Sequence, residues 1–146
     1  IVLVLVLCDA MQQAFGFGDQ YSGWHASAGV LACAWTMLGI QKVRESGWAW
    51  AQANNVGLML AERLYIGPTV RRALSRWILR RPSTLVLLGV MGLGIELAGF
   101  AFCVPDLRMA YAITVFVFMV FNFVIWGFFE FEWGTVGIAV ALGSQV

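Results

Sequence analysis

The sequence predicts an all-α protein built as a polytopic transmembrane helix bundle. Hydrophobic residues make up 61% of the 146 residues and charged residues only 12%, whereas a typical soluble domain has about 25% charged residues. The mean hydropathy of +0.82 agrees with long apolar runs separated by polar turns. Because one crossing needs about 20 apolar residues, the chain has room for about four to five spans. We therefore expect residues 1–146 to form a single transmembrane domain whose first partner is the lipid bilayer.

The first part of the chain is expected to hold one complete crossing and one shorter helix. The run from Ile1 to Ala10 is too short to span and is interpreted as the end of a helix, so that the chain is a stretch of a longer protein. After a Gly-rich turn, GFGDQYS, a crossing is predicted from about Trp24 to Gln41. It ends in Lys42, Arg44 and Glu45, and Gly47 breaks the helix. The apolar run from Val56 to Ile66 is about half as long as a crossing requires, which predicts an interfacial or re-entrant helix.

An arginine-rich stretch occupies residues 71–81. By the positive-inside rule this loop is cytoplasmic, which is consistent with a bacterial inner membrane protein. The spacing also predicts a basic amphipathic helix on anionic headgroups, with Trp77 and Leu79 facing the acyl chains. Since the arginines are confined mainly to this juxtamembrane stretch, no nucleic-acid partner is expected. The stretch contains Arg71, Arg72, Arg76, Arg80 and Arg81.

The second part of the chain is expected to contain the remaining crossings. One extends from Pro82 to about Val104, where Pro105 to Arg108 is predicted to form a tight turn on the outer side. The next crossing runs from Met109 to about Phe129, and a last one begins near Trp133. The crossings then alternate consistently with the arginine-rich loop inside.

Glu96 is the first of three polar groups placed within or beside apolar runs. An ionised carboxylate at the centre of a span costs about 3 kcal/mol on insertion scales, so this side chain is protonated, paired or facing a polar cavity. A functional carboxylate and a protonated packing group are equally compatible with the sequence. The nearby small residues Gly92, Gly94 and Gly99 predict that another backbone packs closely against this face.

Asn122 and Lys42 each have a structural and a functional interpretation. An amide at mid-depth, as in Asn122, usually bonds a neighbouring helix, and Glu96 is its expected partner. A lysine at a helix end, as expected for Lys42, usually extends to the headgroups. The functional alternative is that its amine lies in a cavity and acts as a base.

His25 and Trp48 are the candidates for contact with a cofactor. His25 is the only histidine, so neither a bis-histidine haem nor a histidine-rich metal centre can be built from this chain. The alternatives for His25 are axial ligation of a porphyrin-type pigment or a position at the membrane interface. Trp48 is a candidate platform for a quinone or pigment ring, although its position also suits the headgroup level. No metal site is predicted.

Two motifs carry a resemblance to a known family. The stretch LGIQKVRESGWAW (Leu38 to Trp50), followed by GIELAGF (Gly94 to Phe100) and a further helix opening at Arg108, resembles the membrane domain of vitamin K-dependent gamma-glutamyl carboxylase. It also resembles the related bacterial horizontally transferred transmembrane domain (HTTM) proteins. The resemblance covers about Leu31 to Trp133 and implies a helical membrane domain that binds a quinone-type ligand.

The resemblance also implies roles for individual residues. It puts Lys42 at the family's catalytic lysine, which deprotonates the reduced quinone, Glu96 at the acidic position, and Asn122 at an amide that follows a family histidine. Three residues before Asn122, where many members carry that histidine, this chain has Met119. A methionine has no proton to relay.

Two functional hypotheses follow. In the first, the domain is an enzyme-like quinone binder in which Lys42 is the base, Glu96 orients it and Asn122 bonds a ring oxygen. In the second, the protein is a non-catalytic subunit of a larger photosynthetic or respiratory membrane complex and packs against other subunits, pigments or lipids. Convergence of Lys42 and Glu96 on one cavity favours the first hypothesis, and their separation favours the second.

Overall fold

The described part of the chain consists of helices and contains no strand. The computed structural model describes residues 10, 22–64, 68–127 and 131–144, and the predicted all-α class is confirmed for these residues. The N-terminal helix and the Gly-rich turn expected before residue 22 fall almost entirely outside them. The helices are α2 (Ser22–Ser46), the 3-10 helix η1 (Gly47–Ala51), α3 (Ala53–Arg63), α4 (Thr69–Leu79), α5 (Pro82–Leu97), the 3-10 helix η2 (Ala98–Cys103), α6 (Pro105–Trp126) and α7 (Phe131–Gly143).

Glycine and proline determine several helix ends. Gly47 follows α2 with a φ of 55°, and Gly127 follows α6 with a φ of 77°, a left-handed conformation that glycine adopts without steric cost. Pro82 and Pro105 occupy the first turns of α5 and α6, where a missing backbone N–H leaves no intrahelical bond unmade.

Two predicted boundaries are wrong. Lys42 does not end its helix, because α2 continues to Ser46. Residues Pro105 to Arg108 do not form a loop, since α6 begins at Pro105 directly after Val104. In both places, helical hydrogen bonding includes polar residues that were expected to lie at a helix end or in a turn. Lys42 and Arg108 consequently project from helices and not from turns.

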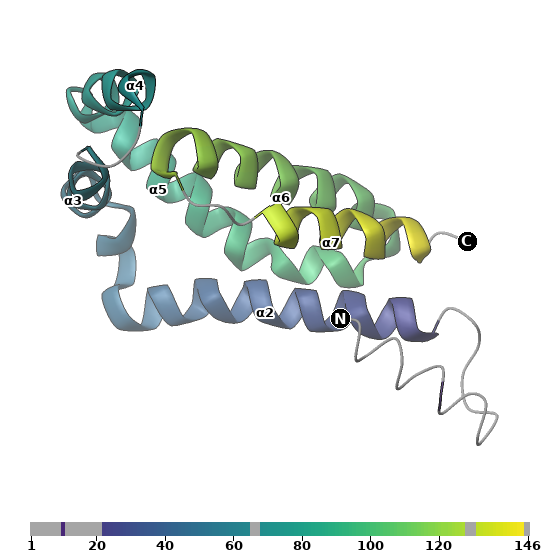
Figure 1. Cartoon of the computed structure of the whole chain (residues 1–146). Coiled ribbons are helices and arrows are strands. Elements are labelled where there is room, and N and C mark those ends of the chain that lie inside the picture. Colours follow the sequence, from purple (N-terminus) through teal and green to yellow (C-terminus); the bar gives the residue numbers. More distant parts are fainter. Residues whose placement is uncertain (1–9, 11–21, 65–67, 128–130, 145–146) are drawn as a thin grey trace.

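The elements are arranged as a bundle with two helices across one end (Figure 1). α2 lies along α5 and η2, while α6 packs against α7. The axes of α3 and α4 run roughly across the direction of the long helices, at the end where α2 terminates (Figure 1). α3 corresponds to the shorter helix expected at Val56 to Ile66, but it begins three residues earlier, at Ala53.

Two helices within the described residues are long and apolar enough to cross a membrane. They are the continuous rod formed by α5 and η2, called here the α5–η2 rod (residues 82–103), and α6. Each is 22 residues long and contains an 18-residue stretch with a mean hydropathy of 2.1. α7 contributes a shorter apolar stretch, Trp133–Gly143. These findings agree with an apolar helical bundle, whereas the number of crossings stays a prediction.

Close approach of backbones joins α2 to the α5–η2 rod. A Cβ added at Gly99 would lie 2.7 Å from the backbone nitrogen of Thr36 and 2.7 Å from the Cβ of Trp35. Beside this contact, the fully buried ring of Phe102 meets Tyr111 edge to face, with 4.9 Å between the ring centroids. The prediction that small residues near Glu96 face another backbone is confirmed at Gly99. It does not hold at Gly94, which has no neighbouring atom within 4 Å of such a Cβ.

Candidate functional site

Lys42 of α2 and Glu96 of α5 meet in the interior of the bundle. The Lys42 ammonium Nζ donates to Glu96 Oε1 in an ion pair, and the side chains are 27% and 9% exposed. A close backbone contact explains the meeting. A Cβ at Gly39 would lie 2.9 Å from the nitrogen of Leu97, so the turn of α2 that carries Lys42 is pressed against the turn of α5 that carries Glu96.

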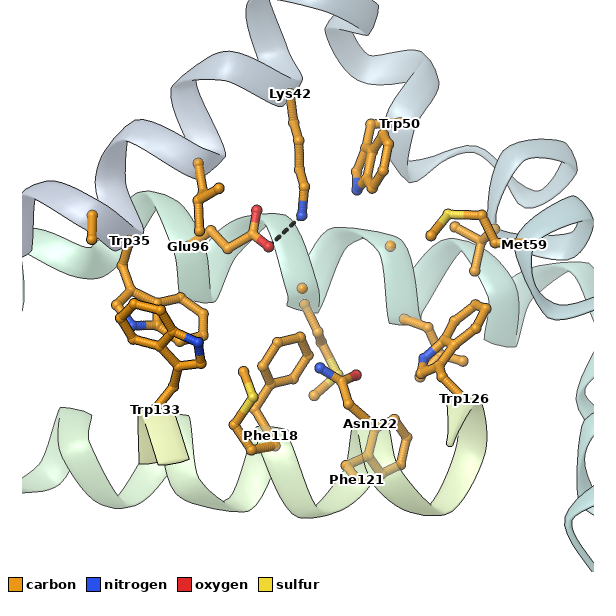
Figure 2. A pocket seen from close by; sticks show the side chains of 18 residues that line it. Trp35, Lys42, Trp50, Met59, Glu96, Phe118, Phe121, Asn122, Trp126 and Trp133 are labelled. Atoms are coloured by element: carbon orange, nitrogen blue, oxygen red, sulfur yellow. Dashed lines mark hydrogen bonds and ion pairs between the residues drawn. The ribbon is translucent and has the colours of Figure 1, made fainter. Parts of the chain in front are cut away.

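The ion pair forms part of the wall of a cavity of about 330 Å³ (Figure 2). Lys42 points into this cavity from α2, Glu96 reaches it from α5, and Asn122 faces both from α6 (Figure 2). Most of the remaining wall is apolar and aromatic. It includes Trp35, Trp50, Met59, Leu88, Phe118, Met119, Phe121, Trp126 and Trp133.

Helical periodicity explains how two elements supply these walls. On α5, Leu88, Gly92 and Glu96 are spaced four residues apart and therefore lie on one face. On α6, Phe118, Asn122 and Trp126 repeat the same spacing. A search for residues four or eight positions before Glu96, and four positions on either side of Asn122, would have found these members of the wall in the sequence. On α2, Trp35 lies seven residues before Lys42, two helical turns away on the same face. Trp133 belongs to α7 and carries no such signal.

One Glu96 oxygen has no partner. Oε1 accepts from Lys42, but Oε2 is buried without a hydrogen bond to any of the residues that the structure describes. A buried acceptor normally has a partner, because leaving it unsatisfied costs about 1–3 kcal/mol. Oε2 is therefore an unused acceptor enclosed by surrounding atoms, and a donor in the cavity reaches it only after the carboxylate turns.

Asn122 lines the same cavity but does not have the partner expected for it. Glu96 is paired with Lys42, and no hydrogen bond joins the Asn122 amide to Glu96 among the described contacts. The physical reason is that the close contact of α2 with α5 brings a cation to Glu96, and a charge-assisted bond is stronger than one to a neutral amide. Asn122 thus stands across the cavity from the ion pair (Figure 2).

Trp50, and not Trp48, is the tryptophan of η1 at the site. The Lys42 Nζ lies 4.7 Å from the centroid of the Trp50 ring, within range of a cation–π contact. Trp48 is 71% exposed and is absent from the cavity wall. The 3-10 helix that begins at Gly47 orients Trp50 toward the cavity and Trp48 away from it, and no pattern in the sequence predicts this orientation.

His25 lies away from the cavity, near the start of α2. Its Nδ1 is 3.3 Å from Nη1 of Arg108, whose Nε donates to the backbone oxygen of Phe102 at 2.6 Å. Arg108 is only 4% exposed. The structure therefore places His25 in a separate polar cluster with Arg108, and not beside Lys42 or Asn122.

The described residues do not assemble a group of three or more His, Cys, Asp or Glu side chains able to hold a metal ion. The comparisons with protein-family models, with curated proteins and with solved structures found no match. The chemistry that the site can perform depends on the groups in its wall. These are one ammonium, one carboxylate with an unpartnered oxygen, one amide and a ring of aromatic side chains.

Proposed function

We propose that this chain is a membrane domain with a carboxylase-like (HTTM-like) helical architecture whose cavity binds a quinone-type ring, in its reduced, hydroxyl-bearing form. The observation that carries the proposal is the unpartnered Oε2 of Glu96 beside the Lys42 ammonium, in the wall of an aromatic cavity. Once the Glu96 carboxylate turns Oε2 toward the cavity, a ring hydroxyl can donate to it, while the flat ring packs against tryptophan and phenylalanine faces.

Size and polarity support a ligand of this class. A volume of about 330 Å³ lies at the lower end of the range of small-molecule sites, about 300–1,000 Å³. The polar groups stand on two sides, with Glu96 and Lys42 on one and Asn122 on the other (Figure 2). A ring with oxygens at opposite positions matches this arrangement, since the Asn122 amide can donate to the second oxygen.

The ion pair suggests how a proton would move. Lys42 Nζ contacts Glu96 Oε1, and in our proposal Lys42 acts as the cation while Glu96 Oε2 accepts the hydroxyl proton. The O–H bond of the ligand breaks, an O–H bond forms on Glu96, and the ring oxygen keeps the electron pair as a phenolate. Lys42 then stabilises that phenolate by its positive charge. This division of roles differs from the assignment of Lys42 as the base, and the two can be separated experimentally.

We further propose a membrane arrangement for the domain. The α5–η2 rod and α6 would cross the bilayer, together with α2 and the segment containing α7. These elements account for four of the about four to five crossings predicted from the sequence. α3 would be the interfacial or re-entrant helix, and the loop at residues 71–81 would be cytoplasmic in a bacterial inner membrane.

A second candidate is a non-catalytic subunit of a larger membrane complex, in which the cavity holds a pigment or lipid tail. Met119 supports this candidate, because it lines the cavity at the position of the family histidine and offers no transferable proton. In that case the Lys42–Glu96 pair would stabilise the packing of α2 on α5 and would have no part in chemistry.

Quenching of tryptophan fluorescence by a short-chain naphthoquinone and its hydroquinone tests the proposal. The full chain in neutral detergent should bind the hydroquinone more tightly than the quinone, because only the hydroquinone donates to Glu96 Oε2. Glu96→Gln should remove most of this preference, about tenfold for the loss of one charge-assisted bond. Equal binding of both forms by the wild type would reject the assigned role of Oε2.

A matched pair of variants controls for the aromatic wall. Trp50→Leu removes an indole beside Lys42 and should weaken ring binding, whereas Trp48→Leu removes an exposed indole from the same short helix and should leave binding unchanged. If both variants, or neither, weaken binding, the ring does not bind in this cavity.

A further inference from the structure

The outward face of α4 carries a row of arginines. Arg72, Arg76 and Arg80 are spaced four residues apart and are all exposed, so they form one line along the helix. No carboxylate lies within ion-pair distance of these three side chains in the described ranges. A line of arginines without acidic neighbours is suited to anionic ligands outside the chain.

An apolar edge runs beside the arginine row. Val70 is 80% exposed and Trp77 is 48% exposed, and by helical spacing both lie at one margin of the exposed surface of α4, next to the arginine row. The opposite side of the helix, with Ser75 and Ile78, is buried against the bundle. The outward face therefore combines charge and exposed apolar surface, the combination that binds at a membrane surface.

One of the five arginines in residues 71–81 is turned inward and anchors this face of α4. Arg71 donates from Nη2 to the backbone oxygen of Phe123 at 3.1 Å and from Nε to that of Val124 at 3.3 Å. These are carbonyls in the last turn of α6, which attract a cation. Arg81 lies over the Trp77 ring, 4.2 Å from its centroid. Arg71 thus holds α4 on α6 and leaves Arg72, Arg76 and Arg80 outside.

The chain connection fixes where α4 lies along the bundle. α4 ends at Leu79 and the apolar rod begins at Pro82. A rod of 22 residues is roughly 33 Å long at 1.5 Å per residue, close to the ~30 Å hydrocarbon core of a bilayer. If the rod crosses a membrane, its first residue stands at the headgroups. α4, which runs across the bundle end (Figure 1), then lies along that surface.

We propose that Arg72, Arg76 and Arg80 form a binding surface for the phosphate headgroups of anionic phospholipids, with Trp77 inserted at the level of the upper acyl chains. This inference depends on membrane insertion but not on a ligand in the cavity. It also corrects one sequence-based expectation: Leu79 does not face the acyl chains, because it packs against the cluster that contains Ile78 and Leu85.

Brominated lipids test the proposal. The full chain is reconstituted in nanodiscs of phosphatidylcholine and phosphatidylglycerol, with bromine placed on either lipid. The Trp77 signal is the difference between the wild type and Trp77→Phe. Quenching should show at least about a fivefold preference for phosphatidylglycerol, the effect of a single basic residue at an anionic surface. The triple variant R72Q/R76Q/R80Q should lose the preference.

A charge-preserving control separates electrostatics from misfolding. The variant R72K/R76K/R80K should keep most of the preference, and added salt should reduce it in the wild type. Far-UV circular dichroism checks that all variants keep the helix content. If the triple glutamine variant does not fold, Arg76→Gln alone should still lower the preference. Equal quenching by both lipids, an unchanged preference in the glutamine variants, or arginine-dependent binding of an oligonucleotide without lipid preference would overturn the proposal.

Discussion

The interface between α2 and the α5–η2 rod has a closed half and an open half. In the closed half, Gly99 lets the backbone of Thr36 approach so closely that even a methyl group has no room, and Phe102 is fully buried nearby. In the open half, Lys42 and Glu96 line a cavity of about 330 Å³. The same two elements therefore form a tight joint and, further along, a space for a ligand.

Each half is associated with one poorly exposed cation, and the two cations differ in their partners. Arg108 contacts a backbone oxygen and a histidine ring, neither of them a carboxylate, and is enclosed by protein. Lys42 pairs with a carboxylate whose second oxygen is buried without a partner, and the pair lines a cavity. The difference teaches that a charged group in an apolar bundle marks a candidate site only when room and an unused polar atom accompany it.

The largest effect is expected from filling the closed half. Gly99→Ala places a methyl group within 2.7 Å of backbone and Cβ atoms that cannot move without separating α2 from η2, so we expect a loss of about 2–3 kcal/mol in the free energy of unfolding. Gly94→Ala is the control, because open space surrounds this position. Thermal unfolding in detergent, followed by circular dichroism, measures both. Equal melting temperatures for the two variants would contradict the tight joint.

Breaking the ion pair should have the next largest effect. Lys42→Met leaves the Glu96 carboxylate buried without its cation, and we expect a loss of about 2 kcal/mol. Adding Glu96→Gln to Lys42→Met should restore about half or more of the loss, since the unpaired charge is then removed. A double-mutant cycle in the unfolding free energy measures the coupling. A double variant less stable than either single variant would indicate that the pair is not the source of the effect.

Removing the enclosed guanidinium should cost less than breaking the pair. Arg108→Met keeps the apolar stem but leaves the Phe102 oxygen without its donor, which predicts a loss of about 1–2 kcal/mol. No anion is left behind, so the loss stays below that of Lys42→Met. The same unfolding experiment compares the two variants. A larger loss of unfolding free energy for Arg108→Met than for Lys42→Met would show that the charge of the partner does not determine the loss.

The smallest effect is expected at His25. Its ring nitrogen is one of two contacts of Arg108, at 3.3 Å, and the imidazole is exposed. His25→Ala should therefore lower the unfolding free energy by about 0.5 kcal/mol. Binding of a quinone-type ring should not change, because His25 lies outside the cavity. A clear loss of ring binding in this variant would restore His25 as a cofactor-contacting residue.

The sequence predicted the elements better than their contacts. The helix break at Gly47 and the helix starting at Pro82 were predictable, because glycine and proline act on their own backbone. Lys42, Glu96 and Asn122 could be singled out because polar side chains are rare in apolar runs. Their roles in chemistry stay predictions. The pairing of Lys42 with Glu96, in place of Asn122 with Glu96, was not predictable from any local pattern.

By itself the sequence determined an apolar, all-helical chain and the few polar positions at which chemistry could occur. These properties follow from composition and from interactions within a few residues, which periodicity and turn residues record. Only the tertiary structure decided that Trp50 and not Trp48 stands over Lys42, and that Arg108 is enclosed while Lys42 opens onto a cavity. Those outcomes depend on how each helix is rotated against its neighbours. Contacts between distant residues such as Gly39 and Leu97 set that rotation.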